Sequence, residues 1–308
     1  MTNRLSPVAL AVCLMVAPAA RGAGGFGAPV VVTGLDTGEP GVEVASDGTI
    51  YVNAPAGLLS NIPASPSFVF RSEDGGATWA LTPPDARADL PGGGDSDVAI
   101  DPATGTLYMT DLWLGSATVS RSTDRGETWL ANPCEGIVVQ DRPWVATSGG
   151  GNVYHVTHQL PSGLVVSKSA APSDGLVYPL STVAATLADQ TGCLCPPGKL
   201  IAEPGTEPLG ADDRVGLIYA TSSGGINFAR SLDGAVTFAN VPVSPPSSAD
   251  TTPAFPVVAS AGSDTLHAVW LEVFGTQSSR VRYARSSDWG ASWTGPVTLV
   301  GAGTSVYP

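Results

Sequence analysis

Residues 71–79 read Arg-Ser-Glu-Asp-Gly-Gly-Ala-Thr-Trp, and the same pattern returns at 121–129 (RSTDRGETW), 230–238 (RSLDGAVTF) and 285–293 (RSSDWGASW). We call these four stretches the box segments. The third is degenerate, with Ala235 in place of glycine and Phe238 in place of tryptophan. The aspartates lie at 74, 124, 233 and 288, so the middle spacing is about twice the other two. One repeat has therefore lost its box segment, and residues 168–175 lie near the missing position.

The residue types of a box segment fit a tight hairpin between two strands. The aspartate can accept backbone N–H bonds in an Asx-type turn, and the glycine permits a positive φ. The tryptophan can pack into the seam between strands. Four carboxylates on four separate repeats cannot converge on one substrate, so we interpret the box segments as structural; a ligand site or a structural calcium site is the alternative.

The strands around the box segments define the repeating unit. Each box segment follows a short β run such as Phe68-Val69-Phe70, and a run rich in β-branched and aromatic residues, such as Thr49-Ile50-Tyr51-Val52, lies further upstream. A turn and one more strand precede that run. The unit is therefore four antiparallel strands in about fifty residues, which is typical of a propeller blade.

A single blade cannot bury both of its faces, so consecutive blades must stack around an axis. We predict an all-β propeller over residues 24–308. Its five blades are expected at 38–86, 92–132, 138–185, 196–244 and 252–300. Residues 305–308 align with the start of a blade's first strand, so we expect a sixth blade to begin there, as in a truncated six-bladed propeller.

Composition and charge favour the same class. The 37 glycines and 27 prolines are spread along the chain as turn residues, only 13% of the residues are charged, and no stretch keeps a helical period. The net charge of −13 repels phosphate backbones, which excludes nucleic acid as an expected partner.

The N-terminus has the layout of a secretory signal peptide. Arg4 precedes an apolar run from Pro7 to Val16 and then small residues, so we expect cleavage near residue 23 and a secreted or periplasmic protein. The apolar run is too short to span a bilayer, and no later segment comes close.

Export favours disulfide formation by the three remaining cysteines. Cys134 lies between the second and third blades, and Cys193 and Cys195 lie between the third and fourth. Because these loops are expected to be neighbours, we predict a disulfide from Cys134 to either Cys193 or Cys195. The three cysteines make a poor zinc set, and no cofactor is expected.

The box segments resemble the BNR, or Asp-box, repeats of sialidases and sialidase-like propellers, and the blade pattern extends that resemblance over the whole of 24–308. In that family the boxes lie on the rim, away from the active centre. Such boxes also occur in other secreted propellers, including glycan-binding, glucanase and non-catalytic ones. The resemblance therefore implies a fold more strongly than an activity.

Topology places a candidate site on the face opposite the box segments. A box between the third and fourth strands shares its face with the turn between the first two strands, so a site is expected at the other mouth of the channel. The catalytic candidates, at the starts of blades, are Asp95, Asp97, Asp141 and Arg142. The substrate-binding candidates, at the ends of second strands, are Trp113, His158, Trp270 and Glu272.

A carboxylate pair with an arginine and aromatic walls is typical of a sugar site. The alternative for each candidate is a solvated loop residue that caps a strand, and for Asp141 and Arg142 a structural ion pair.

A sialidase is implied by the resemblance but opposed by the residues present. That activity would call for three arginines around the substrate carboxylate, a tyrosine nucleophile assisted by a glutamate, an aspartate acid, and an Arg-Ile-Pro-like motif in the first blade. Here Glu39-Pro40-Gly41 stands near the place of that motif, and only Arg142 is well placed. Four other arginines precede box segments and point to the opposite face.

Three functions remain open. The first is a secreted glycoside hydrolase, sialidase-like at most, that acts on extracellular glycans. The second is a non-catalytic propeller that binds glycan or protein, and the third is a purely structural repeat module. The expected partner is a glycan or glycoprotein, and the expected oligomeric state is a monomer.

Overall fold

The computed structural model describes residues 27–35, 37–56, 66–83, 92–113, 115–132, 139–189, 198–247, 256–274 and 278–301. Residues 27–31 belong to an N-terminal unit, and the five sheets belong to the unit that begins at Val32. The predicted signal peptide, the three cysteines of the predicted disulfide and the predicted start of a sixth blade lie outside the described residues.

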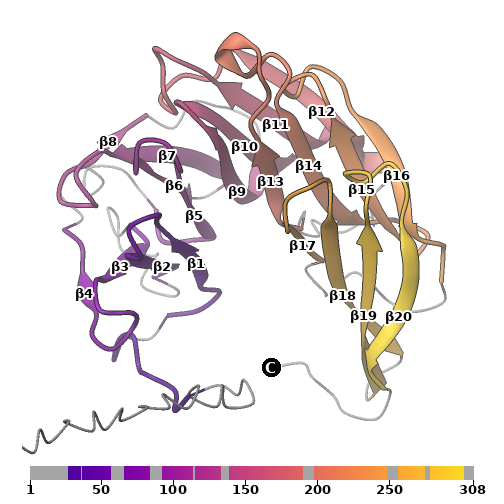
Figure 1. Cartoon of the computed structure of the whole chain (residues 1–308), viewed down its shortest axis with the longest axis horizontal. Helices are drawn as coiled ribbons and strands as arrows, with labels where there is room; N and C mark the ends of the chain where they lie inside the picture. The colour runs from indigo at the N-terminus through magenta and orange to yellow at the C-terminus, as the bar shows by residue number, and fades with distance from the viewer. Residues whose placement is uncertain are drawn as a thin grey trace, which may run out of the picture. The chain divides into compact units, whose positions relative to one another are not determined.

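Five four-stranded antiparallel sheets follow one another in a ring, which confirms the predicted propeller of five blades (Figure 1). The first two blades comprise β1 (Gly41–Val44), β2 (Ile50–Ala54), β3 (Phe68–Ser72), β4 (Ala80–Leu81), β5 (Ser96–Ile100), β6 (Leu107–Trp113), β7 (Ser116–Ser122) and β8 (Leu130–Ala131). The third comprises β9 (Gln140–Gly149), β10 (Asn152–Gln159), β11 (Gly163–Ser169) and β12 (Leu180–Thr186). The last two comprise β13 (Leu200–Glu203), β14 (Arg214–Ala220), β15 (Ile226–Ser231), β16 (Ala239–Ser244), β17 (Val257–Ser260), β18 (Leu266–Phe274), β19 (Ser278–Ser286) and β20 (Thr294–Val300).

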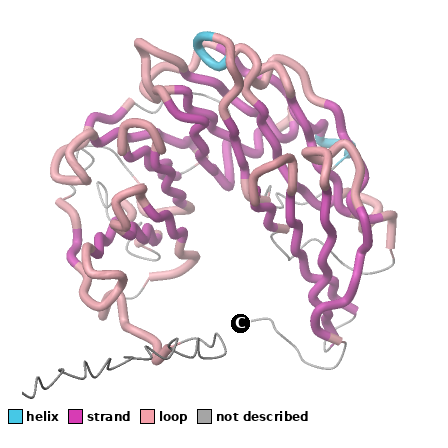
Figure 2. Tube along the Cα trace, in the orientation of Figure 1, coloured by secondary structure: helices cyan, strands magenta, loops and turns pink. Residues whose placement is uncertain are grey.

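The first strand of each blade lies on the inner side of the ring. β1 packs against β5, β5 against β9, β9 against β13, and β13 against β17. The helical elements of the described residues are the single 3-10 turns η2 (Leu187–Asp189) and η3 (Pro208–Gly210), so the chain is otherwise strand and loop (Figure 2).

The hydrophobic core is divided among the seams between consecutive blades. On β14, Leu217 and Tyr219 pack toward the third blade, whereas Ile218 and Ala220 pack toward the fifth. Because such a strand is covered on both faces, its sequence is an almost continuous apolar run instead of an alternating one. Each buried large side chain contributes about 1.5–3 kcal/mol through burial.

Each box segment forms a closed turn within its own blade. Asp74 Oδ1 accepts bonds from Ser72 Oγ at 2.9 Å and from the Thr78 backbone N–H at 2.8 Å, and its Oδ2 accepts one from Thr78 Oγ1 at 2.6 Å. The Gly76 N–H donates to Ser72 Oγ at 2.9 Å, and Gly76 has a φ of 89°. The bonds from Thr78 and then Ser72 lower the pKa of Asp74 to about 2. The same bonds are made by Asp124, Asp233 and Asp288.

The third blade keeps part of this turn where the pattern is lost. Ser169 Oγ accepts a bond from the Gly175 N–H at 2.9 Å, two residues further along than in a box segment. Asp174 stands just before that glycine with a φ of 46°, and its carboxylate binds Arg121 of the second blade at 2.8 Å.

A cation at the end of each third strand links most blades to the next. Four of these side chains donate to a backbone carbonyl of the following blade: Arg71 to Arg125 O (2.8 Å), Arg121 to Asp174 O (3.2 Å), Lys168 to Gly210 O (2.6 Å) and Arg230 to Trp289 O (2.8 Å). Arg285, the equivalent residue of the fifth blade, is exposed. Its bond among the described residues is to Thr265 Oγ1 of its own blade, at 3.5 Å.

Candidate functional site on the channel face

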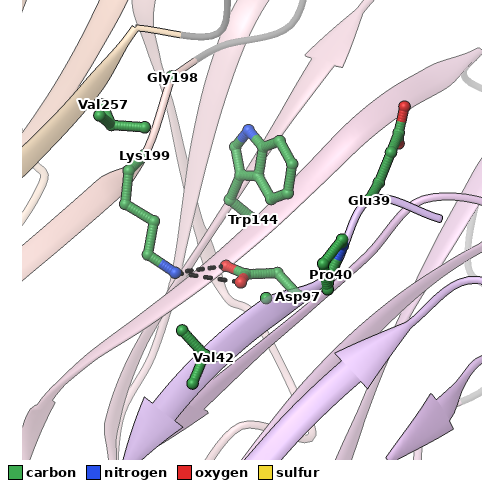
Figure 3. Close-up of a pocket in the computed structure, with 9 residues that line it drawn as sticks. Glu39, Pro40, Val42, Asp97, Trp144, Gly198, Lys199 and Val257 are labelled. Atoms are coloured by element: carbon green, nitrogen blue, oxygen red, sulfur yellow. Dashed lines mark hydrogen bonds and ion pairs between the residues drawn. The ribbon is translucent and has the colours of Figure 1, made fainter. Parts of the chain in front are cut away.

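A cavity of about 410 Å³ lies where the inner strands of the five blades converge. Its lining includes residues from every blade (Figure 3): Glu39, Pro40, Gly41, Val42, Asp97, Trp144, Gly198, Lys199 and Val257. They stand at or near the N-terminal ends of the first strands, whereas the box segments lie beside the turns that follow those strands. The cavity therefore opens on the face opposite the box segments, and its volume is within the usual range for small-ligand pockets.

An ion pair between Lys199 and Asp97 lies on one wall of the cavity, and Glu43, which does not line the cavity, adds a second acid beside Lys199. Lys199 Nζ donates to both carboxylate oxygens of Asp97, at 3.0 and 3.1 Å, and lies 3.7 Å from Glu43 Oε1. Asp97 also accepts the Val145 backbone N–H at 3.1 Å, and its side chain is only 3% exposed. Burial lowers the pKa of Lys199, but the charges of Asp97 and Glu43 outweigh that effect and leave the pKa above its ordinary value. Burial raises the pKa of Glu43.

A second cluster surrounds Arg142 beside the cavity. Its Nη1 lies 3.2 Å from Glu39 Oε2 and 3.3 Å from Asp95 Oδ1, so one guanidinium nitrogen contacts two carboxyl groups. Burial raises the pKa of Asp95 to about 7; Arg142 opposes this shift, and the charges of Glu39 and Asp141 add to it. A carboxyl group that titrates near neutrality beside a pocket is a candidate proton donor.

The backbone at this cluster is held in an uncommon conformation. Glu39 and Arg142 both have a positive φ, 43° and 50°, although neither is glycine. The strand pairing is irregular alongside, because the register of β10 on β9 shifts between Val156 and His158. Non-glycine residues in this region cost about 1–3 kcal/mol each and gather at functional sites.

The structure brings together the four predicted catalytic candidates. Asp97 lines the cavity, and Asp95 and Arg142 form the neighbouring ion pair. Asp141 Oδ1 accepts the Arg142 backbone N–H at 3.0 Å, which ties it to the same cluster. Asp141 does not line the cavity itself.

Three of the four predicted substrate-binding candidates lie elsewhere, and the fourth, His158, is the cross-strand partner of Asp141 in the Arg142 cluster. Trp270 is 2% exposed within the core between the fourth and fifth blades. Glu272 binds Arg280 at 2.6 Å and lies 3.5 Å from Arg282, both on β19 of its own blade. His158 is buried on β10, where burial lowers its pKa, and Trp113 is half-buried at the end of β6. None of the four lines the cavity.

Sequence reasoning missed the aromatic wall and the second cation of this site. Trp144 is half-buried and faces the cavity close to Asp97 and Lys199 (Figure 3). Its place two residues after Arg142 on β9 is the signal that could have found it. Lys199 precedes β13, a short first strand that the repeat pattern did not reveal.

The described residues contain no group of three or more histidine, cysteine, aspartate or glutamate side chains arranged to hold a metal ion. The same residues include no helix that is both long and apolar enough to cross a membrane.

Comparisons with known proteins place the fold but not the family. A scan against protein-family models and a search of curated proteins found no match. Among solved structures, a Hadza microbial sialidase is similar with a TM-score of 0.54 and 20% identity, over 77% of this chain and 50% of the sialidase. The chain thus spans half the length of that protein.

Two other similar structures differ in function from each other. The α-L-arabinofuranosidase of Fusarium graminearum has a TM-score of 0.53 and 14% identity, over 84% of this chain and 80% of its own. A lectin of Aleuria aurantia has a TM-score of 0.57 and 9% identity, over 87% of this chain and 80% of its own. At such identities the likeness establishes a propeller fold shared by glycoside hydrolases and lectins, and it does not choose between catalysis and binding.

Proposed function

We propose that this propeller is an extracytoplasmic glycoside hydrolase of the Asp-box type that binds its substrate in the channel-face cavity. The observation that carries the proposal is the cavity itself, lined by Asp97 and Trp144 and flanked by the ion pair of Arg142 with Asp95, a carboxyl group whose pKa burial raises to about 7. An acid with a pKa near neutrality can protonate the oxygen of a scissile glycosidic bond. The signal-peptide pattern and the resemblance of the box segments support the compartment and the type.

The neighbouring residues supply the other parts of such a reaction. Glycoside hydrolysis commonly uses a second carboxylate that activates water or stabilises the positive charge on the sugar. We assign this role to Asp97, which faces the same cavity and is paired with Lys199. Arg142 orients Asp95, and the Trp144 ring offers an aromatic face for the sugar. Glu39 raises the pKa of Asp95 and so helps to keep it protonated.

A second function, carbohydrate binding without catalysis, is favoured by one observation. The Asp97 side chain is 3% exposed and already accepts bonds from Lys199 and the Val145 N–H. A carboxylate so fully engaged makes a poor nucleophile or base, whereas the cavity and Trp144 would still hold a sugar.

The test compares the wild type with Asp95→Asn, which keeps the shape of the side chain and removes its proton. Hydrolysis is measured on a panel of fluorogenic aryl glycosides, and binding on a glycan array. Glu127→Gln is the matched control, because that acid is on the opposite face with a side chain 53% exposed. We expect Asp95→Asn to abolish turnover and keep binding, and Glu127→Gln to keep both.

Two other results are decisive. Binding by the wild type with no turnover on any glycoside would reject the hydrolase and support the carbohydrate-binding alternative. Neither binding nor turnover would reject both.

A further inference from the structure

The charges around the cavity determine which kind of sugar it can accept, if the proposed function is correct. Two cations belong to the described part of the site, Arg142 and Lys199. Arg142 contacts Glu39 at 3.2 Å and Asp95 at 3.3 Å, and Lys199 contacts Asp97 at 3.0 Å and Glu43 at 3.7 Å. Each cation is therefore already held by two carboxyl groups of the protein itself.

Among the described residues, an acidic ligand would find no cation in this site that is not already held by acids of the protein. To bind Arg142 or Lys199, a carboxylate or sulfate group would have to displace one of the protein's carboxylates and then lie beside the others. Even with Asp95 protonated, the acids Glu39, Asp97 and Glu43 outnumber the two cations. The net charge of −13 gives the chain a negative field of the same sign. The acids around this cavity would therefore repel an acidic sugar.

The remaining lining suits an uncharged sugar. Trp144 presents an aromatic ring, and Pro40, Val42 and Val257 add apolar surface around it (Figure 3). The faces of a sugar ring carry C–H groups that pack on such surfaces. Carboxylates accept hydrogen bonds and cannot donate them, so they match the hydroxyl donors at the edge of the ring.

We propose that this cavity selects an uncharged sugar unit and discriminates against sugars that carry a carboxylate or a sulfate group. The inference refines the proposed function and separates the site from the acidic-sugar specificity that the sequence resemblance implies.

The first experiment measures binding to matched sugar pairs. An array presents glucosides and galactosides beside the corresponding glucuronides and galacturonides, which differ only in the oxidation of C6, together with sialylated and sulfated glycans. We expect the neutral member of each bound pair to bind at least tenfold more tightly. Equal or tighter binding of the acidic member would overturn this inference and leave the proposed function standing, whereas no binding to any glycan would overturn both.

The second experiment tests the negative charge around the cavity with fluorescence quenchers of different charge, in the absence of a sugar. Fluorescence quenching is compared between the wild type and Trp144→Phe, so that the difference isolates Trp144 among the seven tryptophans. We expect acrylamide and caesium to quench this component several-fold more strongly than iodide does, relative to free tryptophan. A Trp144 component that iodide quenches as efficiently as acrylamide would contradict the proposed repulsion.

The two experiments can be linked by one variant. The double variant Glu39→Gln/Asp95→Asn removes both acids on Arg142, because loss of Glu39 alone would lower the pKa of Asp95 and let it ionise. It should raise both the iodide quenching of Trp144 and the relative binding of the uronides. The Glu127→Gln control should change neither, and an unaltered selectivity in the double variant would refute the charge mechanism.

Discussion

Replacement of Arg121 by methionine tests whether the cations at the ends of the third strands join the blades. Arg121 donates to Asp174 O at 3.2 Å and to Asp174 Oδ2 at 2.8 Å across the seam between the second and third blades. The two side chains are 17% and 27% exposed, so water only partly replaces the lost bonds. A charged hydrogen bond contributes about 1.5–3 kcal/mol. Methionine keeps most of the apolar stem, and after a discount for exposure we expect a loss of about 1.5–2.5 kcal/mol.

Arg285→Met is the internal control. This arginine has the same place in its blade, but it is exposed and its bond among the described residues is 3.5 Å long and within its own blade. We expect a loss below about 0.5 kcal/mol. Urea unfolding followed by tryptophan fluorescence measures both variants through the transition midpoint at constant slope. Equal losses in the two variants, or no loss in Arg121→Met, would refute the assigned role.

Three other predictions concern the charged groups. The pKa of Asp95 in the folded protein, about 7, lies above its ordinary value of 3.8, so its stabilising contribution is present in acid and is lost as pH rises toward 7. The free energy of unfolding should therefore fall more between pH 4 and 7 for the wild type than for Asp95→Asn. Parallel pH profiles of the two proteins would contradict this. Glycoside turnover should also decline above about pH 7 as Asp95 ionises, and a rate that stays flat to pH 9 would remove Asp95 as the acid. Lys199→Met leaves Asp97 without its cation and should lower the free energy of unfolding, measured with urea, by about 2–3 kcal/mol. Adding Asp97→Asn to this variant should restore part of that loss. If the losses of the two single variants simply add in the double variant, the two residues are not coupled.

The face of the candidate site could be predicted from the chain, but its full set of residues could not. Asp95, Asp97 and Arg142 were identifiable because each lies where one blade leads into the next, and the hairpin order of a blade places those positions on the face opposite the box segments. By the same hairpin order, Trp270 and Glu272 at the end of a second strand were also expected on this face. They lie inside a seam or against β19 because the side-chain direction at a strand end depends on packing against the adjacent blade.

Lys199 could not be predicted as a residue of the site for a different reason. Nothing in its local sequence marks it as a partner of Asp97, which lies about a hundred residues earlier, and only the convergence of inner strands at the channel brings them to 3.0 Å. The pKa of Asp95 has the same origin, because its burial and its neighbours Glu39 and Arg142 come from three blade junctions.

The sequence alone determined the blade. The spacing of the box segments, the alternation of strands and the Ser-x-Asp-x-Gly turn are local features, and local hydrogen bonds such as those of Asp74 encode them within a few residues. The tertiary structure alone decided which charges meet at the axis. Distant side chains become neighbours there only after the five blades are arranged around one channel, and the balance of burial and charge that sets their chemistry exists in no single repeat.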